Sequence, residues 1–306
     1  MTAAAAGIPV IVNPRSGPEG MQDGGTAITA AFEAKGLRAR IVALAPDDDI
    51  ATTVGELLDA GGTKLIVAAG GDGTVNAVAS CLLDRDATLG ILPMGTLNHF
   101  ARDLGIAPEL EAAVAVIATG HERRTDVGEV NGKAFLNNSS LGLYPRIVSE
   151  REHAQRHLGA GKWPALARAT WHALRHPGSF SASVHVDGRT IERRTPFIFV
   201  GNNCYVLEGF SIGRRTCLDG GVLALYVLRP KSAFGLLWLG LRALLGIGSH
   251  AKDFDAIEAC DFEVLGRHHA VEVATDGEVT RMAAPVRYRI RPRALRVLAP
   301  APKDNS

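Results

Sequence analysis

The sequence has few of the features that mark a secreted or nucleic-acid-binding protein. Its four cysteines are scattered without C-x-x-C spacing, which favours neither a disulfide framework nor a zinc site, so we expect them to be reduced. The 33 basic and 32 acidic residues leave a formal net charge of +1. General nucleic-acid binding is therefore not expected, and any anion binding should be local.

Long apolar runs are also missing. The most apolar stretch, residues 233–248, is too short to cross a bilayer and carries Arg242 inside it. Residues 1–7 lack the basic leader of a secretory signal and run directly into a strand-like segment. We therefore predict a cytoplasmic protein without a transmembrane helix. Its 306 residues, 46% of them hydrophobic, are enough for two compact domains.

The first part of the chain has the pattern of a parallel sheet covered by helices, because short apolar runs alternate with helical patterns. Strands are expected at residues 8–12, 38–44, 64–69 and 88–92, and helices at 25–35, about 50–60, 75–83 and about 108–118. Ligands bind at the carboxyl ends of strands in such sheets, so the Gly, Pro and Asn clusters that end them should converge. We assign residues 1–127 to an α/β nucleotide-binding domain.

The later part is β-rich and predicts an antiparallel second domain, residues 128–292. Strands are expected at residues 181–186, before the hairpin signal Asp187-Gly188, and at 195–202, 222–228, 261–265, 270–274 and 286–290. A basic helical segment, about 146–176, and an apolar helix, about 232–247, interrupt them. The tail, residues 293–306, holds one more strand-like run, 294–298, which could return to the first domain.

A glycine-rich turn, Gly70-Gly71-Asp72-Gly73-Thr74-Val75-Asn76, follows the buried strand of the third βα unit. Glycines let main-chain N–H groups approach phosphate oxygens, and the next helix points its positive end at the same place. Asp72 would then orient a magnesium–water network, and Thr74 would bind a phosphate oxygen while capping the helix. Taken alone, the segment also fits a plain strand-to-helix turn.

A second cluster, residues 93–102 (PMGTLNHFAR), again follows an apolar strand and places Gly95 and Thr96 before a helix. Two such loops on neighbouring strands would face one crevice. Neither a Walker A pattern nor a G-x-G-x-x-G fingerprint is present, which disfavours a P-loop NTPase and a standard NAD enzyme.

These two loops, together with Asn13-Pro14-Arg15-Ser16-Gly17 and Asp276-Gly277-Glu278, occur in the order found in the diacylglycerol kinase catalytic-domain family. The chain resembles that family over nearly its whole length. The family includes bacterial diacylglycerol and YegS-like lipid kinases, sphingosine kinases and ceramide kinases, and it shares a fold with NAD kinases and phosphofructokinases. The resemblance implies ATP and Mg²⁺ as cofactors, and a nucleotide on the α/β side with a lipid on the β side.

The resemblance also implies roles for individual residues. The implied nucleotide-binding residues are Asn13, Ser16, Gly70, Gly71, Asp72, Gly73, Thr74, Asn76, Gly95 and Thr96. The implied catalytic residues are Glu278, the proton acceptor for the lipid hydroxyl, with Asp276 and Asp72. An apolar strand before Glu278 would partly desolvate its carboxylate and so raise its proton affinity. Without the other motifs, the Asp-Gly pair would indicate only an ordinary β-turn.

One further loop, Leu218-Asp219-Gly220-Gly221, resembles the family's structural magnesium loop. Asp219 would be the side-chain ligand, with the carbonyls of Thr216 and Gly221 beside it. A simple hairpin turn is the alternative.

Two positions depart from the family pattern. His99 stands where many members have Asp, so either His99 meets phosphate directly or Asp72 and Asp126 alone carry the metal network. Residues 44–47 lack a threonine that is often found in the family after the second strand, so the resemblance implies that one nucleotide contact is missing.

Two segments suggest contact with a membrane surface. The apolar side chains of residues 234–245 would touch a membrane or cover an acyl chain, with a core helix or a homodimer interface as the alternatives. The basic residues between 146 and 175 would favour anionic lipid headgroups, or form a solvated helix face.

The function expected from these features is an ATP-dependent lipid kinase that transfers the γ-phosphoryl group of ATP to a hydroxyl of a lipid such as diacylglycerol. The alternatives are a sphingosine- or ceramide-type lipid kinase, an NAD-kinase-like enzyme, and a catalytically impaired nucleotide-binding lipid sensor.

Overall fold

The structure, a computed structural model, describes residues 7–13, 24–45, 48–60, 64–142, 145, 180–186, 189–208, 211–215, 217–229, 254–265 and 269–301. The chain forms two compact units. Unit 1 comprises Met1–Val127 and Arg293–Ser306, and unit 2 comprises Gly128–Pro292. Two strands, β5 (His121–Val130) and β18 (Val286–Ala299), run from one unit into the other along the chain. Each unit is described by itself.

Unit 1 is built on a parallel sheet with the order β2-β1-β3-β4-β18. Its elements are β1 (Ile8–Val12), α1 (Gly24–Glu33), β2 (Ala39–Ala43), α2 (Ile50–Asp59), β3 (Leu65–Gly70), α3 (Asp72–Leu82), β4 (Thr88–Pro93), α4 (His99–Asp103), α5 (Leu110–Thr119), the first part of β5 and the last part of β18. The central strands β3 and β4 are almost wholly buried, as their unbroken apolar sequences predict.

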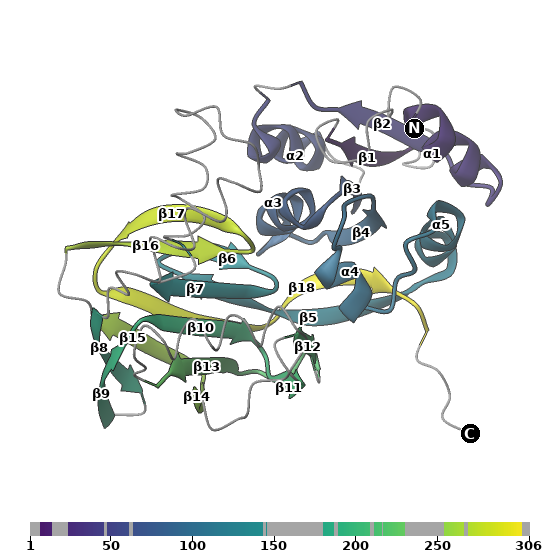
Figure 1. The fold of residues 1–306 in the computed structure, drawn as a ribbon. Coiled ribbons are helices and arrows are strands. Elements are labelled where there is room, and N and C mark those ends of the chain that lie inside the picture. Colours follow the sequence, from purple (N-terminus) through teal and green to yellow (C-terminus); the bar gives the residue numbers. More distant parts are fainter. Residues whose placement is uncertain are drawn as a thin grey trace, which may run out of the picture. The chain divides into compact units, whose positions relative to one another are not determined.

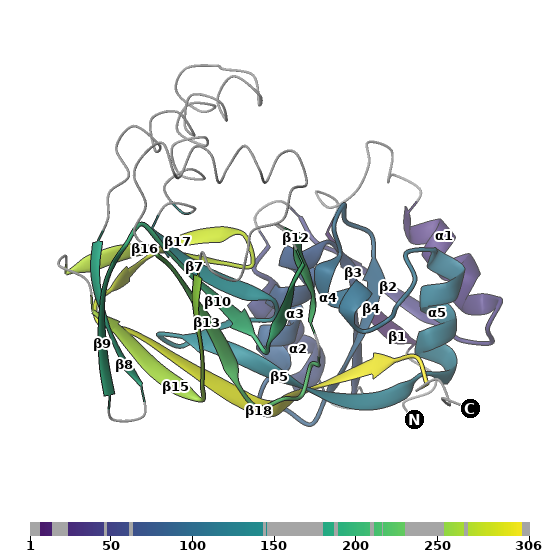
Figure 2. The same cartoon turned by 60° about the horizontal axis from the view of Figure 1, so that its bottom comes forward.

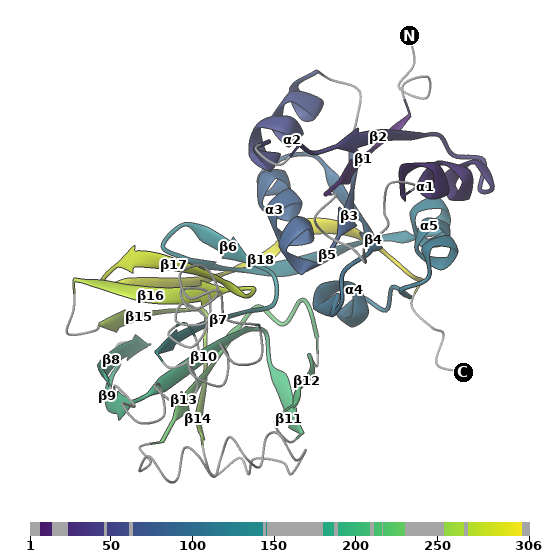
Figure 3. The same ribbon diagram turned by 45° about the horizontal axis from the view of Figure 1, so that its top comes forward.

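Helices cover both faces of this sheet. Figures 1 and 3 show α2 and α3 together on one face, and α1 and α5 together on the other. Local sequence explains where α2 begins, because the carboxylate of Asp49 accepts hydrogen bonds from the N–H groups of Ala51 and Thr52. Its apolar side chains Val54 and Leu57 are buried against the unit.

Unit 2 consists of two facing layers of antiparallel strands (Figure 2). One layer has the order β14-β13-β10-β7-β16-β17, and the other joins β9, β8, β15 and β18, with β5 pairing β18 and β6. The strands that lie wholly in unit 2 are β6 (Lys133–Phe135), β7 (Asn138–Gly142), β8 (Phe180–Val186), β9 (Arg189–Thr195), β10 (Phe197–Asn202), β11 (Tyr205–Glu208), β12 (Ser211–Arg215), β13 (Leu223–Leu228), β14 (Phe254–Ala259), β15 (Asp261–Leu265), β16 (Ala270–Thr275) and β17 (Glu278–Ala283).

The core of unit 2 lies between these layers. Leu225 and Val273 come from one layer, and Phe262 and Tyr288 come from the other. The rings of Phe262 and Tyr288 stack with centroids 4.9 Å apart. The predicted fold class, an α/β domain with a parallel sheet followed by a β-rich antiparallel domain, is confirmed.

Three local expectations need correction or have no outcome. The two strands expected at residues 286–290 and 294–298 are one continuous strand, the 14-residue β18. Helix α3 begins at Asp72, three residues before the expected residue 75, so part of the glycine-rich turn is helical. The segments expected at 146–176 and 232–247 lie outside the described residues. None of the helices in the described ranges combines the length and apolar character that a bilayer-spanning helix requires.

Candidate functional site

The two glycine loops of unit 1 lie against each other. Strands β3 and β4 pair in parallel as far as Gly70 and Pro93, and the N–H of Met94 donates to the carbonyl of Gly70 at 3.0 Å. A Cβ on Gly95 would lie 2.5 Å from the Cα of Gly71. At position 95 only a residue without a side chain fits this approach, which brings the main chains of both loops to the same end of neighbouring strands.

The first turn of α3 is formed by the glycine-rich segment itself. Its N-cap residue is Gly71, and no side chain caps the helix, so the expectation that Thr74 is the cap is wrong. Thr74 lies inside the first turn and is buried, and its hydroxyl accepts a hydrogen bond from Asn13 Nδ2 at 3.3 Å. Gly70 makes room for that side chain, since a Cβ there would lie 2.7 Å from it.

Asp72 and Asn98 fix the second loop to the first. One Asp72 oxygen accepts from the N–H of Phe100 at 3.3 Å and so ties α3 to α4. Asn98 adopts the left-handed conformation (φ 48°). Its side chain binds both polar main-chain groups of Gly95, accepting from the N–H at 2.9 Å and donating to the carbonyl at 2.7 Å. The loop is thus held rigidly, while Thr96 at its tip is exposed.

The other polar residues assigned to the site in unit 1 differ in their burial and in their hydrogen bonds. The amide oxygen of Asn76 is buried and has no hydrogen-bond partner among the described residues. His99 Nδ1 lies 3.0 Å from a guanidinium nitrogen of Arg102. The Asp126 carboxylate is buried and accepts from the N–H of Arg293 at 2.7 Å. Ser16 lies outside the described residues.

In unit 2, Asp276 and Gly277 form the two-residue turn between β16 and β17. Both have positive φ angles, 47° and 90°, and the flanking Thr275 and Glu278 pair across the hairpin. This geometry is the type I′ turn that Asp-Gly favours.

The Asp276 side chain turns inward and holds a distant segment. It is half-buried and accepts hydrogen bonds from three successive N–H groups, those of Leu136, Asn137 and Asn138, at 2.8, 2.9 and 3.0 Å. Burial raises the pKa of this carboxyl above its ordinary value, while the three N–H groups and the Arg215 guanidinium act in the opposite direction. Asp276 therefore fixes the turn that carries Glu278.

Glu278 is the first residue of β17, and its side chain is 66% exposed. The expected partial desolvation by the preceding apolar strand is therefore wrong in this structure. Instead, the Lys133 ammonium donates to its Oε2 at 3.3 Å. Lys133 lies directly after the turn formed by Asn131 and Gly132, and Asn-Gly is a strong local hairpin signal.

A buried polar cluster supports the segment that Asp276 holds. The Arg215 guanidinium donates to the carbonyl of Leu136 and, at 3.2 Å, to Asn137 Oδ1, while Asn202 Nδ2 donates to the same Leu136 carbonyl at 2.9 Å. Arg215 was not anticipated, because nothing in its neighbourhood in the sequence indicates that a charged side chain is buried there.

The loop assigned to magnesium has a partly suitable set of donors. Asp219 is exposed, and Gly221 has a φ of +72°. The buried Asn203 Oδ1 has no hydrogen-bond partner among the described residues and would lie 2.8 Å from a Cβ on Gly220. Within the described ranges, no three His, Cys, Asp or Glu side chains gather as a metal cluster. Thr216 lies outside those ranges.

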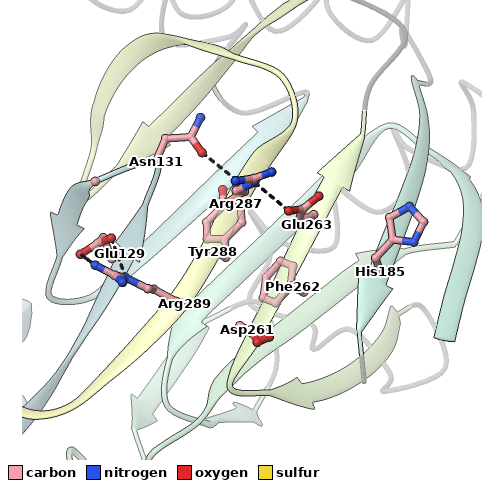
Figure 4. A pocket seen from close by; sticks show the side chains of 10 residues that line it. Glu129, Asn131, His185, Asp261, Phe262, Glu263, Arg287, Tyr288 and Arg289 are labelled. Atoms are coloured by element: carbon pink, nitrogen blue, oxygen red, sulfur yellow. Dashed lines mark hydrogen bonds and ion pairs between the residues drawn. The ribbon is translucent and has the colours of Figure 1, made fainter. Parts of the chain in front are cut away.

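A hollow of about 500 Å³ lies elsewhere in unit 2, on β5, β8, β15 and β18 (Figure 4). Two arginines in its lining pair with two of its glutamates. Arg287 binds Glu263 at 2.7 Å, and Arg289 binds both oxygens of Glu129 at 2.7 and 3.0 Å. It contains none of the residues assigned from the sequence.

The chain matches two family models in succession. Residues 8–130 match the diacylglycerol kinase catalytic domain, and residues 145–299 match the YegS C-terminal NAD kinase beta sandwich-like domain.

Relatives and solved structures agree with these models. A "Probable lipid kinase YegS-like" of Pseudomonas aeruginosa is 31% identical over 291 residues, 92% of each chain. A "Diacylglycerol kinase" of Bacillus subtilis is 42% identical over 143 residues, covering 45% of this chain and 46% of that protein. The crystal structure of a diacylglycerol kinase from Bacillus anthracis superposes with a TM-score of 0.69 at 22% identity, over 96% of this chain and 97% of that one, which shows the shared fold. The chain therefore belongs to the diacylglycerol kinase catalytic-domain family, together with the YegS-like lipid kinases.

Proposed function

We propose that this protein is an ATP-dependent lipid kinase that transfers the γ-phosphoryl group of ATP to a hydroxyl of a lipid, with diacylglycerol as the first candidate. One observation carries the proposal. The two loops expected to hold phosphates lie against each other at the ends of neighbouring strands. They do so in a chain that is similar to a "Probable lipid kinase YegS-like" over 92% of its length.

The nucleotide would be bound by main-chain groups of unit 1. The first N–H groups of an α-helix have no partner inside the helix, and the helix dipole favours an anion there. The N-cap of α3 is a glycine, and Gly95 lies beside it, so no side chain blocks an approach of phosphate oxygens. Asp72 is held at this point by its bond to Phe100 and would face the phosphates.

Magnesium would supply positive charge that neutralises the phosphoryl oxygens as charge develops on them. The donors around Gly220 are oxygen atoms, which fit a hard cation: the Asp219 carboxylate, the Gly221 carbonyl and the buried amide oxygen of Asn203. Asp219 and Gly221, with Thr216, would hold a structural ion. Asp72 is the residue that we assign to the ion beside the phosphates.

The acceptor hydroxyl would lose its proton to Glu278. The hydroxyl oxygen attacks the γ-phosphorus in line, the bond from that phosphorus to the bridging oxygen breaks, and ADP leaves. Asp276 contributes indirectly, because it fixes the turn that carries Glu278.

The test is phosphorylation by radiolabelled ATP of diacylglycerol, sphingosine, ceramide and NAD, with the lipids in mixed micelles. Wild type should label diacylglycerol at the full rate, whereas Asp72→Ala and Glu278→Gln should each leave only a small residual rate. Glu263→Gln is a matched control, since it alters another ion-paired glutamate of unit 2 and should keep wild-type labelling.

Each other outcome selects an alternative. Labelling of sphingosine or ceramide alone would identify that lipid, and not diacylglycerol, as the acceptor. Labelling of NAD would favour an NAD-kinase-like enzyme. Tight ATP binding without labelling of any acceptor would favour a lipid sensor. Labelling that both substitutions leave intact would refute the assigned residues.

A lipid acceptor implies work at a membrane surface, so the proposal extends to peripheral membrane association. Co-sedimentation with diacylglycerol-containing vesicles tests membrane association. A protein that stays in the supernatant would contradict it. Light scattering of the same sample would show whether the protein is a homodimer.

A further inference from the structure

The candidate base is in contact with a lysine that none of the recognised motifs includes. Lys133 Nζ donates to Glu278 Oε2 at 3.3 Å and to the hydroxyl of Thr280 at 3.1 Å. Glu278 and Thr280 are alternate residues of β17, so their side chains lie on the same face of that strand. The ammonium thus bridges the base and the next residue on its own face, and its side chain is only 32% exposed.

Lys133 lies on a short strand that is fastened at both ends to the hairpin of Glu278 and the strand that follows it. Before β6, Asn131 donates to the carbonyl of Ala283 at 2.9 Å and accepts from the N–H of Arg287 at 2.8 Å. After β6, the three N–H groups of residues 136–138 bind the Asp276 carboxylate. The three-residue β6 therefore has little freedom to move along β17, and the place of the Lys133 backbone is fixed.

This arrangement leaves one oxygen of the base available. Lys133 binds Oε2, so Oε1 has no bond to the ammonium and can accept the hydroxyl proton of the acceptor. An exposed ion pair of this kind contributes little to the stability of a fold. Its effect is on the orientation of a side chain that is otherwise two-thirds exposed and able to adopt several rotamers.

We propose that Lys133 is a positioning residue for Glu278, an inference that rests on the proposed lipid kinase function. Lys133 acts by holding one carboxylate oxygen, so that the other faces the acceptor hydroxyl in the reactive rotamer. Lys133 lies in unit 2 and is not among the residues assigned to the nucleotide, so its loss should lower the rate of the chemical step and leave nucleotide affinity unchanged.

The test compares full-length wild type, Lys133→Met, Lys133→Arg, Glu278→Gln and the double variant Lys133→Met/Glu278→Gln, with radiolabelled ATP and the lipid that wild type phosphorylates. Lys133→Met should lower kcat by about 10- to 100-fold, the range expected when a catalytic group loses its orientation, with the KM for ATP unchanged. Lys133→Arg should restore most of the rate, because a guanidinium also binds a carboxylate. In the Glu278→Gln background, Lys133→Met should change kcat by less than about twofold.

Arg229→Met is the matched control, since it breaks another exposed ion pair of unit 2, with Asp255 at 3.0 Å, and should keep the wild-type kcat. The inference is overturned if Lys133→Met keeps the wild-type kcat while Glu278→Gln retains only a small residual rate. It is equally overturned if Lys133→Met lowers kcat by the same factor with and without Glu278. Failure of the proposed function looks different, because wild type itself would then label no lipid.

Discussion

Substitution of Gly95 by alanine should damage the nucleotide site more than the fold. The added Cβ would lie 2.5 Å from the Cα of Gly71 and 2.8 Å from Asn98 Oδ1, whereas ordinary van der Waals contacts begin at 3.4 Å. The Gly71 contact is with main chain, so no side chain can rotate away. Because 3.4 Å minus 2.5 Å is 0.9 Å, one loop must move by about 1 Å relative to the other.

Two magnitudes follow from that displacement. Overpacking in a well-packed region costs about 1–3 kcal/mol of the free energy of unfolding. A misplacement of about 1 Å in groups that position a substrate can lower the rate about 100-fold. Asn98 adds to the effect, because it binds both the N–H and the carbonyl of Gly95 and cannot keep both bonds after the shift. We therefore expect kcat/KM for ATP to fall by about two orders of magnitude.

Gly55→Ala is the matched control. Gly55 lies within α2 of the same unit, and a Cβ there would meet nothing within 4 Å. That variant should keep the wild-type rate and gain up to about 1 kcal/mol of stability, because alanine favours a helix interior. ATP binding by titration calorimetry, thermal unfolding and the kinase assay measure the three quantities. Wild-type ATP affinity in Gly95→Ala would refute the idea that the contact between the loops forms the phosphate site.

Three further predictions concern unit 2. Burial raises the Asp276 pKa above its ordinary 3.8. The stability that this carboxyl contributes is therefore present below pH 3.8 and is lost as the pH rises through the folded-state pKa. The amide in Asp276→Asn does not titrate. The variant should therefore gain stability relative to wild type as the pH rises above 3.8, measured as the difference in unfolding free energy, and a constant difference would contradict the reasoning. Burial raises the pKa of the Cys204 thiol to about 11. Alkylation at pH 8 should therefore modify the exposed Cys260 first and Cys204 slowly, as measured by mass spectrometry. Equal alkylation rates would contradict this prediction. Replacing Asn131 by glycine removes two side-chain hydrogen bonds and should lower the free energy of unfolding by about 1–2 kcal/mol. Alanine should lower it by about 1 kcal/mol more, because the φ angle of residue 131 is 46°. Equal melting temperatures for the two variants would exclude that backbone strain.

The sequence predicted the fold best where one strand or helix is decided by its own residues. The strand at Ile8–Val12 and the helix at Ile50–Asp59 fall close to their expected bounds, because apolar runs and an Asp N-cap act within a few positions. Strands such as β5 and β7 were missed. In β7, Asn138-Ser139-Ser140 looks like a loop, yet Ser139 is fully buried and its hydroxyl binds Tyr288 at 2.9 Å. A partner 149 positions away gives no local signal.

The sequence distance between contacting residues also decides which candidate-site residues could be predicted. In unit 1 the polar contacts that shape the loops are local or nearly so, since Asn98 binds Gly95 three positions away and Asp72 binds Phe100 28 positions away. Motifs of contiguous residues therefore contain most of what fixes this half. The helix cap was misassigned, because the exact start of α3 depends on Gly71 rather than on the threonine.

The residues of unit 2 that we assign to the acceptor depend on contacts that no motif joins. Asp276 binds Leu136 across 140 positions, and Lys133 reaches Glu278 across 145. The Asp-Gly-Glu triplet specifies a tight turn and a carboxylate, but the orientation of that carboxylate comes from the strand that the triplet holds beside it. Substitutions between Asn131 and Asn138 should therefore alter the use of the acceptor while leaving ATP affinity unchanged. Substitutions of Gly71 or Gly95 should instead lower ATP affinity directly. Titration calorimetry on both sets of variants separates the two effects.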